Sequence, residues 1–64
     1  MQLTEDLCSL EEPWRTRFLV LIANHATGQQ WDGQVPDRSE VTAWLEEDAA
    51  LQRQIALMLE TWRK

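Results

Sequence analysis

The chain has 64 residues, a formal net charge of −5, 44% hydrophobic residues and four tryptophans. This length allows at most one domain, so we expect a single domain over residues 1–64. Cys8 is the only cysteine, which excludes the intrachain disulfides that stabilise many small secreted proteins. The negative charge also disfavours binding to the phosphates of nucleic acids.

The N-terminal sequence MQLTEDLCSL is acidic where a secretion signal would be basic. The longest apolar run, residues 18–23, is far shorter than the roughly 20 residues that a membrane helix needs. These two features predict a cytoplasmic protein without a membrane segment.

The first predicted helix lies near residues 4–11, with Thr4 as its N-cap. Its apolar face follows helical spacing and consists of Leu3, Leu7 and Leu10. Pro13 interrupts this pattern and predicts a break or kink. Alternatively, Ser9 and Glu12 form a capping box for a helix that carries Pro13 in its first turn.

The second predicted helix runs from about residue 13 to residue 25. Apolar groups and one imidazole recur along it at helical spacing: Trp14, Phe18, Leu21, Ile22 and His25. Leu19, Val20 and Ala23 leave little polar face, so this helix is either central to a bundle or part of a subunit interface. A buried strand over residues 18–23 is the alternative, although the flanking periodicity favours a helix.

The connection to the next helix is expected to be long, at roughly 12 residues, where 2–8 are usual between packed helices. Gly28 ends the second helix, and Asp32 and Gly33 form a turn signal. Trp31 lies within this connection. Its ring either anchors the loop to the protein's own core or contacts a partner.

The third predicted helix covers residues 39–46 and is capped by Asp37 or Ser39. Its apolar face consists of Val41, Trp44 and Leu45. Asp48 is expected to cap a separate fourth helix, although a single helix over residues 39–62 is the alternative.

The fourth predicted helix, residues 49–63, repeats the spacing of the second. Its apolar positions are Leu51, Ile55, Met58, Leu59 and Trp62. Arg63 and Lys64 place positive charge at its negative end. By their spacing, Trp14, Trp44 and Trp62 are predicted to be core residues.

The sequence does not assemble a catalytic, cofactor or metal site, so we expect no enzyme. His25 is explained by a helix C-terminus, where a cation is favoured. Carboxylates surround Cys8 and would disfavour its thiolate. The acidic pairs lack the alternating ligand spacing of a calcium loop and fit solvated helix N-termini.

The two C-terminal helices have the outline of a helix-turn-helix, with three polar side chains near the start of the second: Gln52, Arg53 and Gln54. An ordinary helical hairpin has the same outline. The acids at residues 46–48 would lie close to DNA phosphates, so the hairpin is favoured.

Together these patterns predict an all-α fold: a compact bundle of three to four short helices, with a long Trp-containing connection between the second and third. The predicted function is that of a small, acidic, non-catalytic protein interaction module or adaptor, which forms a homodimer or docks on a larger protein. The predicted partner contacts are Trp31, Val35, Arg38, Leu19 and Val20.

Two other classes remain as hypotheses: a DNA-binding regulator, and an acidic inhibitor of a basic nucleic-acid-binding protein. Both predict association that weakens steeply with salt, whereas an adaptor with apolar contacts does not. No cofactor or small-molecule substrate is expected.

Overall fold

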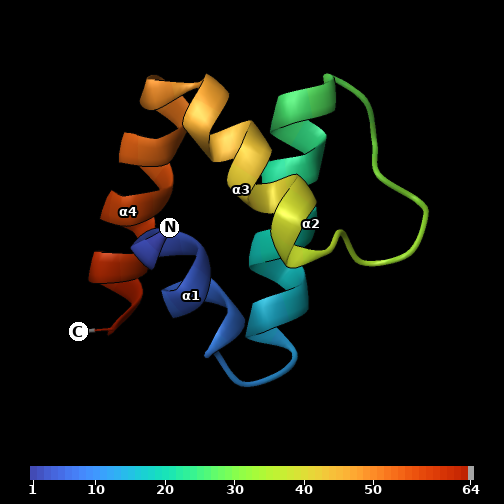
Figure 1. Cartoon of the computed structure of the whole chain (residues 1–64). Helices are drawn as coiled ribbons and strands as arrows, with labels where there is room; N and C mark the ends of the chain where they lie inside the picture. Colours follow the sequence, from blue (N-terminus) through green and yellow to red (C-terminus); the bar gives the residue numbers. More distant parts are fainter. Residues whose placement is uncertain (64) are drawn as a thin grey trace.

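The computed structural model describes residues 1–63 and contains four helices (Figure 1). They are α1 (Gln2–Cys8), α2 (Trp14–Thr27), α3 (Arg38–Glu47) and α4 (Ala49–Arg63). No strand occurs within these residues, so the predicted all-α class is confirmed. The strand alternative for residues 18–23 is excluded because they lie in the middle of α2.

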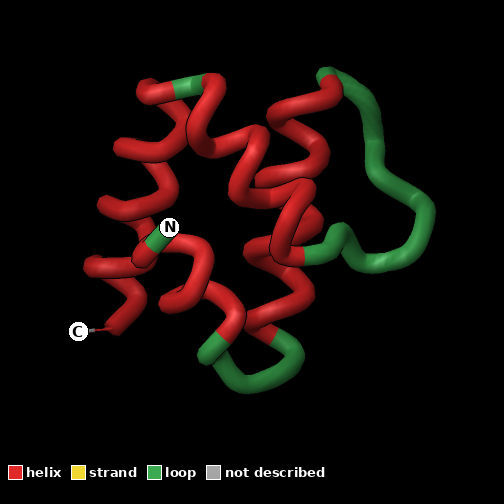
Figure 2. Tube along the Cα trace, in the orientation of Figure 1, coloured by secondary structure: helices red, strands yellow, loops and turns green. Residues whose placement is uncertain are grey.

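The four helices form a bundle in which each helix contacts the other three (Figure 1). The N-terminus lies near α4, and the chain ends where α4 ends. Residues 28–37 connect α2 to α3 and arc outward on the side of α2 away from α4 (Figure 2).

The ends of three helices follow local rules. Gly28 ends α2 in the left-handed conformation, with φ of 70°, which glycine adopts without steric cost. Asp37 rather than Ser39 caps α3, because its carboxylate accepts the backbone N–H three residues further on. Asp48 is extended and caps the next helix in the same way, so two C-terminal helices are present rather than one.

The start of α1 differs from the prediction. The helix begins at Gln2, and Thr4 lies inside it, fully buried. The Thr42 hydroxyl donates a hydrogen bond to the Thr4 hydroxyl at 3.0 Å, which links α3 to α1. Thr4 is thus a buried polar residue that has a partner, as burial requires, and it is not a cap. Ser9 bonds back to the carbonyl of Glu5, so the alternative capping box is not formed either.

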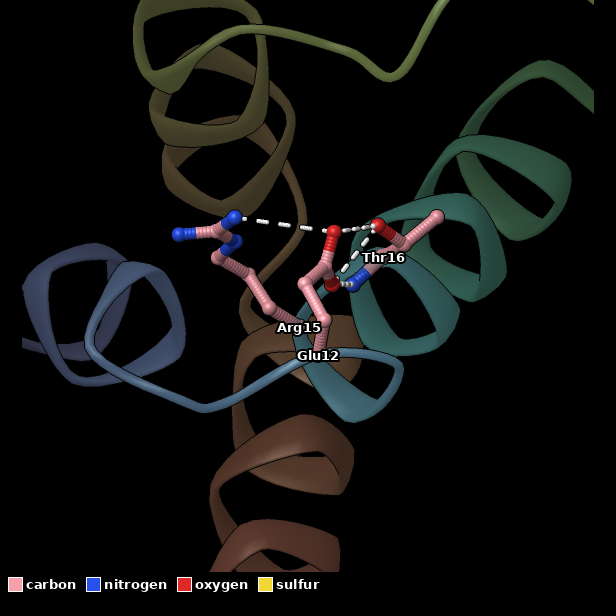
Figure 3. A network of polar contacts seen from close by, with 3 residues as sticks. All are labelled: Glu12, Arg15 and Thr16. Carbon is pink, nitrogen blue, oxygen red and sulfur yellow. Dashed lines mark hydrogen bonds and ion pairs between the residues drawn. The ribbon is translucent and has the colours of Figure 1, made fainter.

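Glu12 supplies the polar contacts at the start of α2 (Figure 3). Its carboxylate accepts the Thr16 backbone N–H at 2.8 Å and also lies within hydrogen-bond distance of the Thr16 hydroxyl. The Arg15 guanidinium is 3.5 Å away. The Thr16 hydroxyl, then the Thr16 N–H and more weakly Arg15, hold the pKa of Glu12 below its ordinary value, although the partial desolvation of the carboxylate opposes this shift.

We expect Thr16→Val to raise the pKa of Glu12, because the substitution removes the hydroxyl and keeps the backbone N–H. NMR titration of the Glu12 carboxyl carbon measures this change. A depressed pKa stabilises the fold above the ordinary value of 4.5, and this contribution is lost as pH falls through the folded-state pKa. The variant should therefore lose less stability between neutral and acidic pH than the wild type. An unchanged pKa would show that the hydroxyl contributes nothing.

The hydrophobic core draws on all four helices and on the short connection after α1. Its buried members are Leu7, Leu10, Phe18, Leu19, Ile22, Val41, Leu45, Leu51, Ile55 and Leu59. In α4 the buried positions recur every four residues, which keeps them on one helical face. Arg63 lies in the last turn of α4 as expected, whereas Lys64 lies outside the described residues.

Candidate interaction surface between α2 and α4

Two tryptophans that were predicted to be core residues lie at the surface. Trp14 is 40% exposed and Trp62 is 42% exposed, so the core prediction is wrong for both. Trp44 is half-buried and packs against the core. Trp62 follows the buried Leu59 by three residues, which turns its side chain about 60° away from the core direction. That rotation places it at the boundary between α4 and α2.

A continuous apolar depression runs along this boundary. We call it the α2–α4 groove and define it by six residues: Trp14, Phe18, Leu21, Leu57, Met58 and Trp62. Three adjoining hollows make up the groove, and Met58 lines all of them. The largest has a volume of about 460 Å³.

Aromatic rings form one end of the groove. The centroids of Trp14 and Trp62 are 6.0 Å apart, and Phe18 meets Trp62 edge-on at 6.4 Å. The Arg17 guanidinium lies over the Trp14 ring, 5.2 Å from its centroid. These distances are typical of aromatic pairs and of a cation–π contact. The side chains of the aromatic end therefore support one another through contacts within the chain.

The groove concentrates the exposed apolar side chains of the described residues. Seven large hydrophobic residues are exposed within residues 1–63, and five of them line the groove: Trp14, Leu21, Leu57, Met58 and Trp62. Single exposed hydrophobic residues are ordinary, whereas several gathered in one place are typical of interaction and ligand-binding surfaces.

Neither of the partner contacts predicted in α2, Leu19 and Val20, lines the groove. Leu19 is only 5% exposed and belongs to the core. The prediction that it lies on a solvent-facing side of the helix is therefore wrong. Val20 is half-buried, and Leu21 is the exposed apolar residue of this run. The monomer itself covers four residues of α2: Phe18, Leu19, Ile22 and Ala23. The apolar content of α2 therefore does not by itself require a second subunit to cover it.

Trp31 packs inward on its own chain. Its ring meets Trp44 edge-on, with centroids 5.6 Å apart, and is half-buried. The indole N–H donates to the carbonyl of Gln34 at 2.7 Å, and the backbone N–H donates to the side chain of Asn24. These contacts tie residues 28–37 to both α2 and α3. That the exposed part of the Trp31 ring contacts a partner stays a prediction.

The remaining predicted contacts do not gather around Trp31 into an apolar surface. Val35 is 47% exposed in the connection. Arg38 pairs with Glu5 at 3.1 Å, and both side chains are solvent-exposed, so this ion pair contributes little to stability. The prediction that Val35 and Arg38 contact a partner remains open.

The α3–α4 pair has Asp48 alone as its connection, which is shorter than the usual three- to four-residue turn of a helix-turn-helix. The side-chain amide of Gln52 is turned toward the protein and donates to the carbonyl of Leu45 at 3.4 Å. Arg53 and Gln54 are exposed, and exposed acids occupy residues 46–48 just before them.

The residues singled out for chemistry lie apart. His25 is exposed near the end of α2, and Cys8 is half-buried at the end of α1. Within residues 1–63 no three His, Cys, Asp or Glu side chains cluster so as to hold a metal ion. None of the helices in this range is long and apolar enough to cross a membrane.

Sequence reasoning missed the groove because it assigned each apolar position to one buried face. The available signal was the second apolar stripe of α4, Met58 and Trp62, beside the stripe Leu51, Ile55 and Leu59. A helix with two apolar stripes covers more surface than one neighbour can bury.

Comparison with known protein families, with curated proteins and with solved structures finds no match to this chain. The function is therefore inferred from the surface itself.

Proposed function

We infer that this chain is a small, acidic, non-catalytic protein interaction module that holds a protein partner in the α2–α4 groove. The observation that carries this proposal is the gathering of five exposed large apolar side chains in one groove of a 64-residue chain. Two of them, Trp14 and Trp62, belong to the residue type that most often dominates binding energy at interfaces.

In this proposal the connection between α2 and α3, residues 28–37, is structural and does not bind the partner. Its Trp31 packs on Trp44 of α3, and none of its residues lines the three hollows of the groove. The cytoplasmic location expected from the N-terminal sequence belongs to the same proposal, since a reduced compartment suits a chain with one free cysteine.

Photo-crosslinking in cells that produce the protein tests this function. A photoreactive phenylalanine analogue at Leu57, which is 57% exposed in the groove, should give a discrete adduct with another protein. The same analogue at Ala56, exposed on α4 but outside the groove, should give little of that adduct. Mass spectrometry of the adduct identifies the partner.

Other outcomes of this experiment contradict the proposal. An adduct formed mainly from a probe at Val35 would transfer the contact to the connection between α2 and α3. Adducts with nucleic acid at Arg53 would favour the DNA-binding alternative. The absence of any protein adduct at Leu57, with the variant folded by circular dichroism, would reject the groove as an interface.

A further inference from the structure

The α2–α4 groove has a direction and a length. Trp14 near the start of α2 meets Trp62 near the end of α4, whereas His25 at the other end of α2 lines a hollow with Leu51. The two helices are therefore antiparallel along the groove. From Leu51 to Trp62 the α4 helix rises about 16 Å, which is the length of a helix of about 11 residues.

The charge of the groove is opposite to that of the protein. The chain carries 11 Asp and Glu residues against 6 Lys and Arg, yet none of those carboxylates lines the three hollows. The cation of the lining is Arg17, next to the aromatic end. Among residues 1–63 the ion pairs use Arg15 and Arg38, so no carboxylate of this range engages Arg17.

This charge pattern argues against a second copy of the chain as the occupant. Two copies that meet through this face would bring Arg17 of each copy toward the groove of the other. The lining of that groove contains no carboxylate to pair with it. Each copy also carries a formal net charge of −5, so their overall fields repel. A partner with carboxylates beside its apolar residues matches the groove better.

The backbone hydrogen bonds of a bound peptide indicate its conformation in the groove. The groove is lined mostly by apolar side chains, and within residues 1–63 no strand edge is present to pair with an extended peptide. An extended segment would bury N–H and C=O groups without partners, which costs free energy. A helix satisfies these groups internally and presents apolar residues at i, i+3 or i+4, and i+7.

Resting on the function proposed above, we propose that the α2–α4 groove receives an amphipathic helix of another protein, about three turns long, with Asp or Glu beside the apolar residue that enters the aromatic end. Arg17 pairs with that carboxylate while its guanidinium stays over Trp14. The cation–π contact uses the flat face of the guanidinium, whereas an ion pair uses the N–H groups at its edge. Arg17 can therefore make both at once.

The test is a selection from a library of random peptides of about 15 residues displayed on phage, with the full chain as the target. We expect the enriched peptides to carry apolar residues at helical spacing and an adjacent Asp or Glu. Arg17→Glu should weaken binding of the selected peptide about tenfold or more in fluorescence titrations. Replacement of the peptide carboxylate by Lys should restore binding to this variant.

Arg53→Glu is the matched control, because Arg53 is exposed on α4 and lines none of the three hollows. It makes the same change in charge and should leave the affinity unchanged. Equal losses from both variants would overturn the assignment of Arg17, since they would reflect net charge alone.

Enrichment of proline-rich or basic peptides, or of none, would overturn the acidic helix. A dimer in sedimentation equilibrium that Leu57→Glu dissociates would assign the groove to a second copy instead. With a different class of peptide enriched, a crosslink from Leu57 to another protein would still support the interaction module, whereas a second copy in the groove would give a crosslink from Leu57 to the chain itself. Failure of this inference can therefore be told apart from failure of the proposed function.

Discussion

Leu19→Ala should lower the free energy of unfolding by about 2–5 kcal/mol, the usual cost of truncating a buried leucine. Leu19 is 5% exposed and packs in the core shared by the four helices. A domain of this size rarely has more than about 3–5 kcal/mol of stability from its core, so this variant should be largely unfolded at room temperature. Urea unfolding followed by circular dichroism measures the change.

Leu21→Ala is the matched control, because it makes the same truncation two residues away in the same helix. Leu21 is 40% exposed in the α2–α4 groove, so its loss should cost far less stability. It should instead weaken binding to the partner that crosslinks at Leu57. A reversed order of stability losses would contradict both the core and the groove as described.

Trp31→Ala should free the connection between α2 and α3 and lower the free energy of unfolding by about 2 kcal/mol. A fully buried tryptophan removes about 200 Å² from water, worth roughly 5 kcal/mol as an upper value, and the partly buried Trp31 contributes less. The substitution also removes the edge-on contact with Trp44. Hydrogen exchange of the amides in residues 28–37 should become markedly faster.

Val35→Ala is the control within the same connection, since Val35 is 47% exposed and its truncation removes little buried surface. Exchange in residues 28–37 should then stay close to that of the wild type. If Trp31→Ala left the exchange of this segment unchanged, the anchor would lie in the Asn24 contact to the backbone of residue 31 rather than in the ring.

The four tryptophans divide into two pairs with different environments. Trp31 of the connection meets Trp44 of α3. Trp14 and Trp62 meet at the groove, where about two fifths of each side chain stays in contact with solvent. The first pair joins the connection to α3, and the second leaves apolar surface exposed at the groove.

Local signals in the sequence were sufficient for most helix boundaries. Gly28, Asp37 and Asp48 act through contacts within a few residues of themselves, so their effects can be read without knowledge of the fold. The predicted start of the first helix, with Thr4 as its N-cap, was wrong. A threonine can either cap a helix or lie buried within one, and the local sequence does not distinguish these two roles. Thr42, which is 38 residues away in the chain, decides between them.

The apolar groups of α2 show a further limit. Leu19, Val20 and Leu21 are adjacent and similarly apolar, yet one is buried, one half-buried and one exposed. Which of the three is covered depends on where the other helices pack around α2. That arrangement depends on contacts between segments far apart in the chain, which periodicity within one helix does not contain.

The sequence by itself determined that the chain is helical, where most of its helices begin and end, and which residues could supply a core, because these properties arise from neighbouring residues. Only the tertiary structure decided which apolar residues remain exposed to solvent after the helices pack. Four short helices bury one stripe of α4 and leave Met58 and Trp62 beside Trp14 and Leu21. A surface made by two helices exists only after they pack, and the candidate interaction site of this protein is such a surface.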